Sequence, residues 1–92
     1  MDTTYELAPD AVLQLADEEA LLVKLTDENM YALNASGAAI VQRIAAGEPV
    51  DRVIDGLAAT FDADPADLAR DVRDLVGELM RRGLLVARQE GA

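Results

Sequence analysis

The sequence predicts an α+β fold in which a three-stranded antiparallel sheet is followed by three helices. The main evidence is a change in hydrophobic period at Leu33-Asn34. Before this junction, short runs rich in β-branched and aliphatic residues are separated by polar clusters of hairpin length, and after it the apolar residues follow the three-and-four spacing of helices. So small a sheet does not close on itself, and an edge strand is expected to stay free for pairing.

Three segments have the composition and length of strands. They span residues 12–16, 20–25 and 30–33. Side chains alternate along a strand, so Met30 and Ala32 are expected on one face of the third strand and Tyr31 and Leu33 on the other. Leu33 is expected to be a core residue. The free edge is expected along residues 29–33.

Each predicted helix has a recognisable start or stop. Asn34 is expected to cap the first helix, which ends at Gly47. Asp64 is expected to cap the third helix, with Pro65 at the first helical position, and Gly83 is placed for a Schellman stop. The apolar residues at helical spacing, which predict the buried faces, are Ile40, Val41, Ile44, Val50, Val53, Ile54, Leu57, Ala58, Phe61, Leu68, Val72, Leu75 and Leu79.

The length of 92 residues fits one small domain, which we expect to span residues 1–92 with an ordered core over about residues 10–87. A chain of this size buries roughly 60 to 65% of the surface that its unfolded form exposes. Residues 84–86 are expected either to form a short returning strand or to fold over the core. Only the first few and the last few residues are expected to be loose ends.

The composition limits the classes of partner. The chain has 8 Lys and Arg against 18 Asp and Glu, a net charge of −10. A field of that sign repels phosphate backbones, so nucleic acid is not expected as a partner. The same field favours encounter with a basic peptide, although acidity that serves solubility alone explains the composition equally well. The absence of Cys from the sequence excludes disulfides and thiolate metal sites.

The sequence has no signal for membrane insertion. No stretch approaches the roughly 18 to 20 consecutive apolar residues of a membrane span, and the first residues lack the basic region of a signal peptide. A soluble, cytoplasmic protein without a membrane partner is therefore expected.

The side chains that support catalysis are scarce. The sequence has no His, no Cys and no Gly-rich phosphate loop, and Ser36 has no neighbouring base to activate it. The carboxylates between the apolar helical positions are expected on the solvent-exposed faces of the helices, not in a catalytic site. They are Asp51, Asp55, Asp71, Asp74 and Glu78. Asp62, Asp64 and Asp67 lack the central Gly and distal Glu of a calcium-binding EF-hand loop. We therefore expect a protein that is not an enzyme and has no cofactor and no metal.

Two further classes of binding protein fit less well. Acyl or peptidyl carrier proteins bear their prosthetic arm in an Asp-Ser-Leu triplet, whereas Ser36 lies in Asn34-Ala35-Ser36-Gly37 and follows strands that are foreign to that fold. A winged-helix DNA-binding protein is compatible with three helices. Its third helix faces phosphates, and here that helix is rich in Asp and Glu. The charge therefore disfavours this class.

An ordered set of residues resembles the PqqD-like proteins, also called recognition elements of ribosomally synthesised and post-translationally modified peptides (RiPPs). The set consists of Leu33-Asn34, Gly37, Ile40, Gly47, Val53-Ile54, Leu57, Asp71-Val72, Leu75, Leu79 and Gly83-Leu84-Leu85. The resemblance runs from about Val12 to Val86. Pro49 departs from the hydroxyl residue that the family has at the start of the second helix, which leaves the capping of that helix in question.

The resemblance implies a winged helix-turn-helix-like fold that binds the leader region of a precursor peptide. In the family, the leader adds as a strand beside the third strand, in a cleft closed by the third helix. The peptide-binding residues expected here are Asn29, Met30, Tyr31, Ala32 and Leu33 on the strand, and Val72, Arg73, Val76, Gly77 and Met80 on the helix. For Val72, Val76 and Met80 a place in the core is an equal alternative. Gly77 suits close approach of another chain or close helix packing.

Two settings within the family are considered. The junction Leu33-Asn34-x-x-Gly37-x-x-Ile40 is similar to that of the stand-alone leader-binding proteins of lasso-peptide biosynthesis. There the protein presents the precursor peptide to a separate leader peptidase, with a cyclase acting afterwards. The alternative is a PqqD-type chaperone that delivers its precursor to a radical S-adenosylmethionine enzyme in pyrroloquinoline quinone synthesis.

Overall fold

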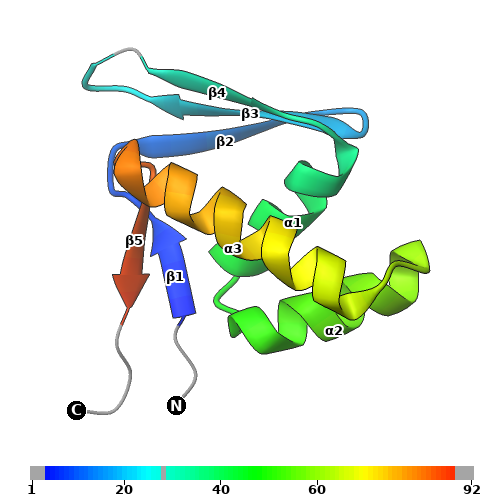
Figure 1. Cartoon of the computed structure of the whole chain (residues 1–92). Helices are drawn as coiled ribbons and strands as arrows, with labels where there is room; N and C mark the ends of the chain where they lie inside the picture. The colour runs from blue at the N-terminus through cyan, green and yellow to red at the C-terminus, as the bar shows by residue number, and fades with distance from the viewer. Residues whose placement is uncertain (1–3, 28, 89–92) are drawn as a thin grey trace.

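The computed structural model describes residues 4–27 and 29–88, which form two small antiparallel sheets and three helices (Figure 1). In chain order the elements are β1 (Thr4–Leu7), β2 (Ala11–Ala16), β3 (Glu19–Lys24), β4 (Met30–Leu33), α1 (Ala35–Ala45), α2 (Val50–Phe61), α3 (Pro65–Arg81) and β5 (Leu85–Arg88). The predicted α+β class, with three antiparallel strands leading into three helices, is confirmed.

The three-stranded sheet has the order β2-β3-β4, so β3 is central and β4 lies at one margin (Figure 1). In the register of β3 and β4, Leu22 lies opposite Tyr31 and Ala20 opposite Leu33. These four residues are at least partly buried, whereas Met30 is 63% exposed. The predicted alternation along β4 and the core position of Leu33 are therefore confirmed.

A second sheet pairs β1 with β5, so the ordered part of the chain begins before residue 10, where the core was expected to start. Tyr5 lies opposite Ala87 and Leu7 opposite Leu85. Tyr5 and Leu7 also pack against the core, which explains why a four-residue strand is stable here. Of the two alternatives for residues 84–86, the returning strand is the one observed, from Leu85 onward. The predicted loose ends at residues 1–3 and 89–92 lie outside the described residues.

The helix ends follow the predicted capping chemistry. Asn34 Oδ1 accepts the Gly37 N–H of α1 at 2.8 Å, and Asp64 Oδ1 accepts the Ala66 N–H of α3 at 2.8 Å. The Leu84 N–H donates to the Leu79 carbonyl at 2.9 Å, which is the Schellman closure expected around Gly83. The prediction for α2 also holds, because no side-chain hydrogen bond caps it at Pro49.

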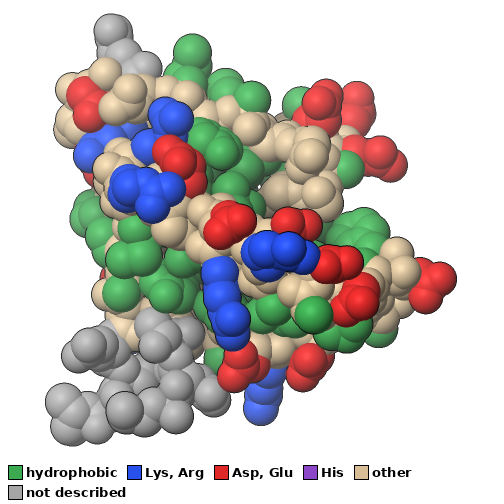
Figure 2. All heavy atoms as spheres, viewed as in Figure 1, with side chains coloured by type: hydrophobic (Ala, Val, Ile, Leu, Met, Phe, Trp, Pro, Cys, Tyr) green, Lys and Arg blue, Asp and Glu red, His purple; other side chains and the backbone are tan. Residues whose placement is uncertain are grey.

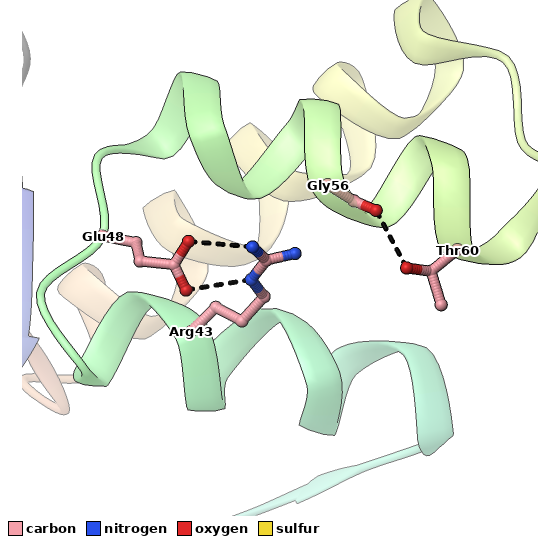
Figure 3. A network of polar contacts seen from close by, with 4 residues as sticks. All are labelled: Arg43, Glu48, Gly56 and Thr60. Carbon is pink, nitrogen blue, oxygen red and sulfur yellow. Dashed lines mark hydrogen bonds and ion pairs between the residues drawn. The ribbon is translucent and has the colours of Figure 1, made fainter.

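The core is aliphatic, and all three helices and both sheets contribute to it. Its fully buried large side chains are Leu22, Val41, Ile44, Val53, Val72, Leu79, Leu84 and Leu85. Outside the core, Arg43 of α1 donates two hydrogen bonds of 2.9 Å to Glu48, and its guanidinium lies against Gly56 of α2 (Figure 3). This ion pair joins α1 to the loop before α2 and places the Arg43 guanidinium beside α2. In the part of the chain that the structure describes, no helix is both long and apolar enough to cross a bilayer.

Candidate functional site

The outer edge of β4 presents main-chain groups that its neighbour β3 does not use. The Lys24 N–H donates to the Asn29 carbonyl at 2.8 Å. Bonded and non-bonded positions alternate in an antiparallel pair, so the backbone groups of Tyr31 and Leu33 point toward β3. Those of Met30 and Ala32 therefore point away from the sheet. Among the described residues, β4 pairs with β3 alone, which confirms the predicted free edge.

A groove runs between this edge strand and α3, and two hollows form it. One, of about 440 Å³, is lined by Tyr31, Arg73, Asp74, Leu75, Gly77, Glu78 and Arg81. The other, of about 410 Å³, is lined by Tyr31, Ala32, Leu33, Asn34, Ser36, Gly37, Ile40, Asp71 and Leu75. Tyr31 and Leu75 line both hollows, so the two are adjoining parts of one depression, which we call the β4–α3 groove. Figure 2 shows basic and acidic side chains side by side over the region of α3.

One end of the groove is tied together by a set of charged contacts. Glu78 accepts hydrogen bonds from Arg81 at 2.9 Å and from Arg82 at 2.8 Å. These hydrogen bonds hold the pKa of the Glu78 carboxyl below its ordinary value. The guanidinium of Arg82 in turn lies over the ring of Tyr31, 4.9 Å from its centroid. The contacts connect α3 to β4 directly.

The arrangement favours binding over chemistry. The groove offers outward main-chain groups, apolar surface at Tyr31 and Leu75, and guanidinium and carboxylate groups along α3. Within the described residues, no three His, Cys, Asp or Glu side chains are gathered closely enough to hold a metal ion. An extended peptide matches these features, because its own main chain pairs with an edge strand and alternate side chains enter a groove.

The strand half of the predicted site lies at the groove. Tyr31, Ala32 and Leu33 line it. Met30 lies on the same edge, with its side chain on the exposed outer face of the sheet. Asn29 precedes the strand, and its N–H donates to Asp27 Oδ1 at 3.2 Å.

The helix half is placed less uniformly. Arg73 and Gly77 line the groove. Val72 and Val76 are core residues, 0% and 5% exposed, and line neither hollow. Met80 is 41% exposed and also lines neither hollow. Five of the ten predicted residues therefore line the groove, namely Tyr31, Ala32, Leu33, Arg73 and Gly77. Asn29 and Met30 lie at the β4 edge beside it, and Val72, Val76 and Met80 lie elsewhere.

Several groove residues were not predicted. They are Leu75, Asp71, Asp74, Glu78 and Arg81 of α3, with Asn34, Ser36, Gly37 and Ile40 around the start of α1. The sequence does assign Leu75 to an apolar stripe, but which side of that stripe meets β4 depends on how α3 is rotated against the sheet. That rotation is a tertiary property, so the apolar pattern alone does not give it.

Sequence and structure comparisons identify the family. The sequence profile described as "Coenzyme PQQ synthesis protein D (PqqD)" matches residues 11–85. No curated protein matches the chain in sequence.

Three solved structures are similar. "TbiB1 in Complex with the TbiA(beta) Leader Peptide" has 25% identity and a TM-score of 0.81, covering 95% of this chain and 96% of that one. "Lasso peptide synthetase B1 complexed with the leader peptide" has 26% identity and a TM-score of 0.82, covering 89% and 96%. The PqqD part of PqqCD from Methylobacterium extorquens, a stand-alone RiPP recognition element, shares the fold at 20% identity and a TM-score of 0.73, covering 89% and 87%. With three quarters or more of its length matched by one family, the chain belongs to the PqqD family.

Proposed function

We propose that this protein is a RiPP recognition element that binds the leader region of a precursor peptide as an added strand along β4. The observation that carries the proposal is the free β4 edge, which lies beside a groove walled by α3. Two of the similar structures, those of TbiB1 and of lasso peptide synthetase B1, support it, since both are complexes with leader peptides and both resemble this chain over most of its length.

Main-chain pairing gives such a complex its affinity, and the groove gives it selectivity. The N–H and C=O groups of Met30 and Ala32 are positioned to bond with the leader backbone. Alternate side chains of the added strand then face α3 between Tyr31 and Leu75, while the others join Met30 and Ala32 on the outer face. No covalent step by this protein is part of the proposal, which describes binding without turnover.

The setting that we favour is lasso-peptide biosynthesis, in the cytoplasm where ribosomes make the precursor. The protein holds the leader and presents it to a separate leader peptidase. Support comes from the structure of lasso peptide synthetase B1, which is more similar to this chain in fold, at a TM-score of 0.82, than the PqqD structure is, at 0.73. A PqqD-type chaperone for a radical S-adenosylmethionine enzyme is the second candidate, and the matching family profile favours it.

A proline on the edge tests strand addition. Ala32→Pro removes an outward N–H and leaves the bonds of Tyr31 and Leu33 to β3 in place. The matched control is Leu15→Pro on β2, at the opposite edge of the sheet. The Leu25 N–H donates to the Asp10 carbonyl, and bonded positions alternate along β2, so the Leu15 N–H also points away from β3. The probe is a synthetic peptide with the leader sequence of the precursor encoded beside this gene, and binding is followed by fluorescence anisotropy.

We expect Ala32→Pro to weaken binding at least about tenfold while Leu15→Pro binds like the parent protein. Far-ultraviolet circular dichroism checks that both variants fold. Amide hydrogen exchange of the unmodified protein gives a second measurement that needs no variant. Leader binding should protect the amides of Met30 and Ala32 most, because Tyr31 and Leu33 are already bonded to β3. Equal binding by both proline variants, or no added protection on β4, would refute strand addition here.

The choice of setting has its own test. The protein is titrated with a lasso precursor leader and, separately, with a precursor peptide of pyrroloquinoline quinone synthesis. Tighter binding of the first supports the lasso assignment, and tighter binding of the second reverses it. Co-purification with the leader peptidase, dependent on the lasso leader, is the expected sign of presentation.

A further inference from the structure

We propose that the α3 wall of the β4–α3 groove contains a carboxylate-binding notch, formed by Arg73 and Arg81 on either side of Gly77, that takes an acidic side chain of the bound leader. The inference rests on the proposed function, because the leader supplies the carboxylate. The inference requires that the leader peptide carry an acidic residue, and it specifies where along the added strand that residue lies.

The spacing of the three residues creates the notch. Arg73, Gly77 and Arg81 recur every four positions, so they lie along one face of α3, one helical turn apart. All three line the same hollow of about 440 Å³. Gly77 contributes no side chain between the two guanidinium groups, and a Cβ there would meet only Arg81 Nη1, at 3.6 Å. The packing of this chain therefore leaves the space above Gly77 open.

The charges at this end of the groove leave positive charge available. Both carboxylate oxygens of Glu78 are engaged, one by Arg81 Nη2 at 2.9 Å and the other by Arg82 Nε at 2.8 Å. Arg73 forms no ion pair with any of the residues that the structure describes. Asp74 also lines the hollow, so its lining holds two guanidinium groups and two carboxylates, and Arg82 adds a third guanidinium over the Tyr31 ring. With Arg82 counted, this end of the groove carries one more positive than negative charge, in a chain whose net charge is −10.

A peptide carboxylate suits this notch better than other anions. Guanidinium groups bind planar carboxylates through paired hydrogen bonds. The field of the whole chain repels a polyanion such as nucleic acid, whereas a single carboxylate delivered on a paired strand is held near the arginines by the strand itself. The other hollow has Asp71 as its one charged lining residue and no Lys or Arg. The acidic side chain is therefore expected beside Tyr31 and Arg81, and disfavoured beside Asn34.

The experiment uses the full chain and the synthetic leader of the precursor encoded beside this gene. Arg73→Gln and Arg81→Gln remove the notch charges singly and together. Arg70→Gln is the matched control, because Arg70 is an exposed arginine on α3 that pairs with Asp67 and lines neither hollow. In the peptide, each Asp and Glu is replaced in turn by Asn or Gln, and every pair of protein and peptide is titrated at low and at moderate salt.

We expect each notch variant to weaken binding roughly three- to tenfold and Arg70→Gln to leave it unchanged. Neutralising one acidic position of the peptide should weaken binding to the parent protein by a similar factor. The same peptide change should not weaken binding to the Arg73→Gln, Arg81→Gln double variant any further, which is the signature of direct coupling. Higher salt should reduce the difference. If the leader binds and protects β4 but no acidic position couples to Arg73 or Arg81, or its bound segment has no acidic residue, the notch is refuted and strand addition stands. A leader that leaves β4 unprotected refutes both.

Discussion

The guanidinium of Arg82 lies over the ring of Tyr31, 4.9 Å from its centroid. Arg82 follows the last turn of α3, and Tyr31 is a groove-lining residue of β4. The same guanidinium donates from Nε to Glu78 at 2.8 Å, so its plane is held while it covers the ring. This cation–π contact joins the two walls of the β4–α3 groove at one end.

We predict that Arg82 and Tyr31 are energetically coupled. Removing the cation with Arg82→Gln, or the ring with Tyr31→Leu, should lower the free energy of unfolding. In a double-mutant cycle the coupling should be about 0.5 to 1 kcal/mol, as for cation–π pairs at exposed sites. Urea denaturation of the four proteins measures it. Tyr31→Phe keeps the aromatic ring and should keep the coupling to Arg82. A coupling near zero with Tyr or with Phe at position 31 would contradict a cation–π contact.

A second prediction concerns Asn34, which caps α1 at the other end of the groove. Its Oδ1 accepts the Gly37 N–H at 2.8 Å, and a Cβ at position 37 would lie 3.2 Å from that oxygen, so Asn34 and Gly37 are matched. Asn34→Ala should cost about 1 kcal/mol of stability, whereas Asn34→Asp should retain most of it. Urea unfolding of the two variants decides the point, because equal stabilities would show that the cap contributes nothing.

The elements that depend on local chemistry could be predicted from the sequence. The period change at Leu33-Asn34, the caps Asn34 and Asp64 and the stop at Gly83 all recur in the structure because each uses neighbouring residues. Strand β1 could not be predicted in this way. Its four residues pair with β5 at the far end of the chain, and a pattern so short gives no periodic signal without its partner.

The candidate site shows the same division. The edge of β4 follows from strand count and alternation, which the sequence supplies. The helix wall requires the rotation of α3 about its own axis, and a stripe that contains Val72, Leu75 and Val76 does not specify which of them meets β4. In the structure Val72 and Val76 are buried, and Leu75 lines the groove. Charged substitutions at Val76 would therefore report on folding, not on peptide binding.

The two helical glycines of α2 and α3 should respond differently to alanine. At Gly77 the nearest atom to an added Cβ is Arg81 Nη1 at 3.6 Å, an ordinary contact. Gly77→Ala should therefore stabilise the protein by about 0.5 to 1 kcal/mol through helix propensity. It should also weaken leader binding, because the methyl group enters the notch. Thermal unfolding and anisotropy titration measure the two effects separately.

Gly56 of α2 provides the contrast. A Cβ there would lie 2.8 Å from Cζ of Arg43, whose guanidinium is held by two hydrogen bonds to Glu48 (Figure 3). Gly56→Ala must displace that guanidinium, so the gain in helix propensity should be offset and leader binding should not change. Equal stabilisation by both alanines would mean that Arg43 yields without cost.

Our last prediction concerns acid and the same ion pair. Hydrogen bonds from Arg43, and its charge, hold the pKa of the Glu48 carboxyl below its ordinary value of 4.5 in the folded protein. In the unfolded chain Glu48 takes up its proton near its ordinary pKa, whereas in the folded protein it does so only at lower pH. The contribution of Glu48 to the free energy of unfolding is therefore present at neutral pH and is lost as the pH falls through the folded pKa. Glu48→Gln should therefore be less stable than the parent near pH 7 and approach it near pH 3. Urea midpoints of both proteins at the two pH values test this, with Arg43→Gln expected to behave like Glu48→Gln and the double variant to lose little more. A stability difference that stays constant between the two pH values would mean that the pair does not titrate with folding.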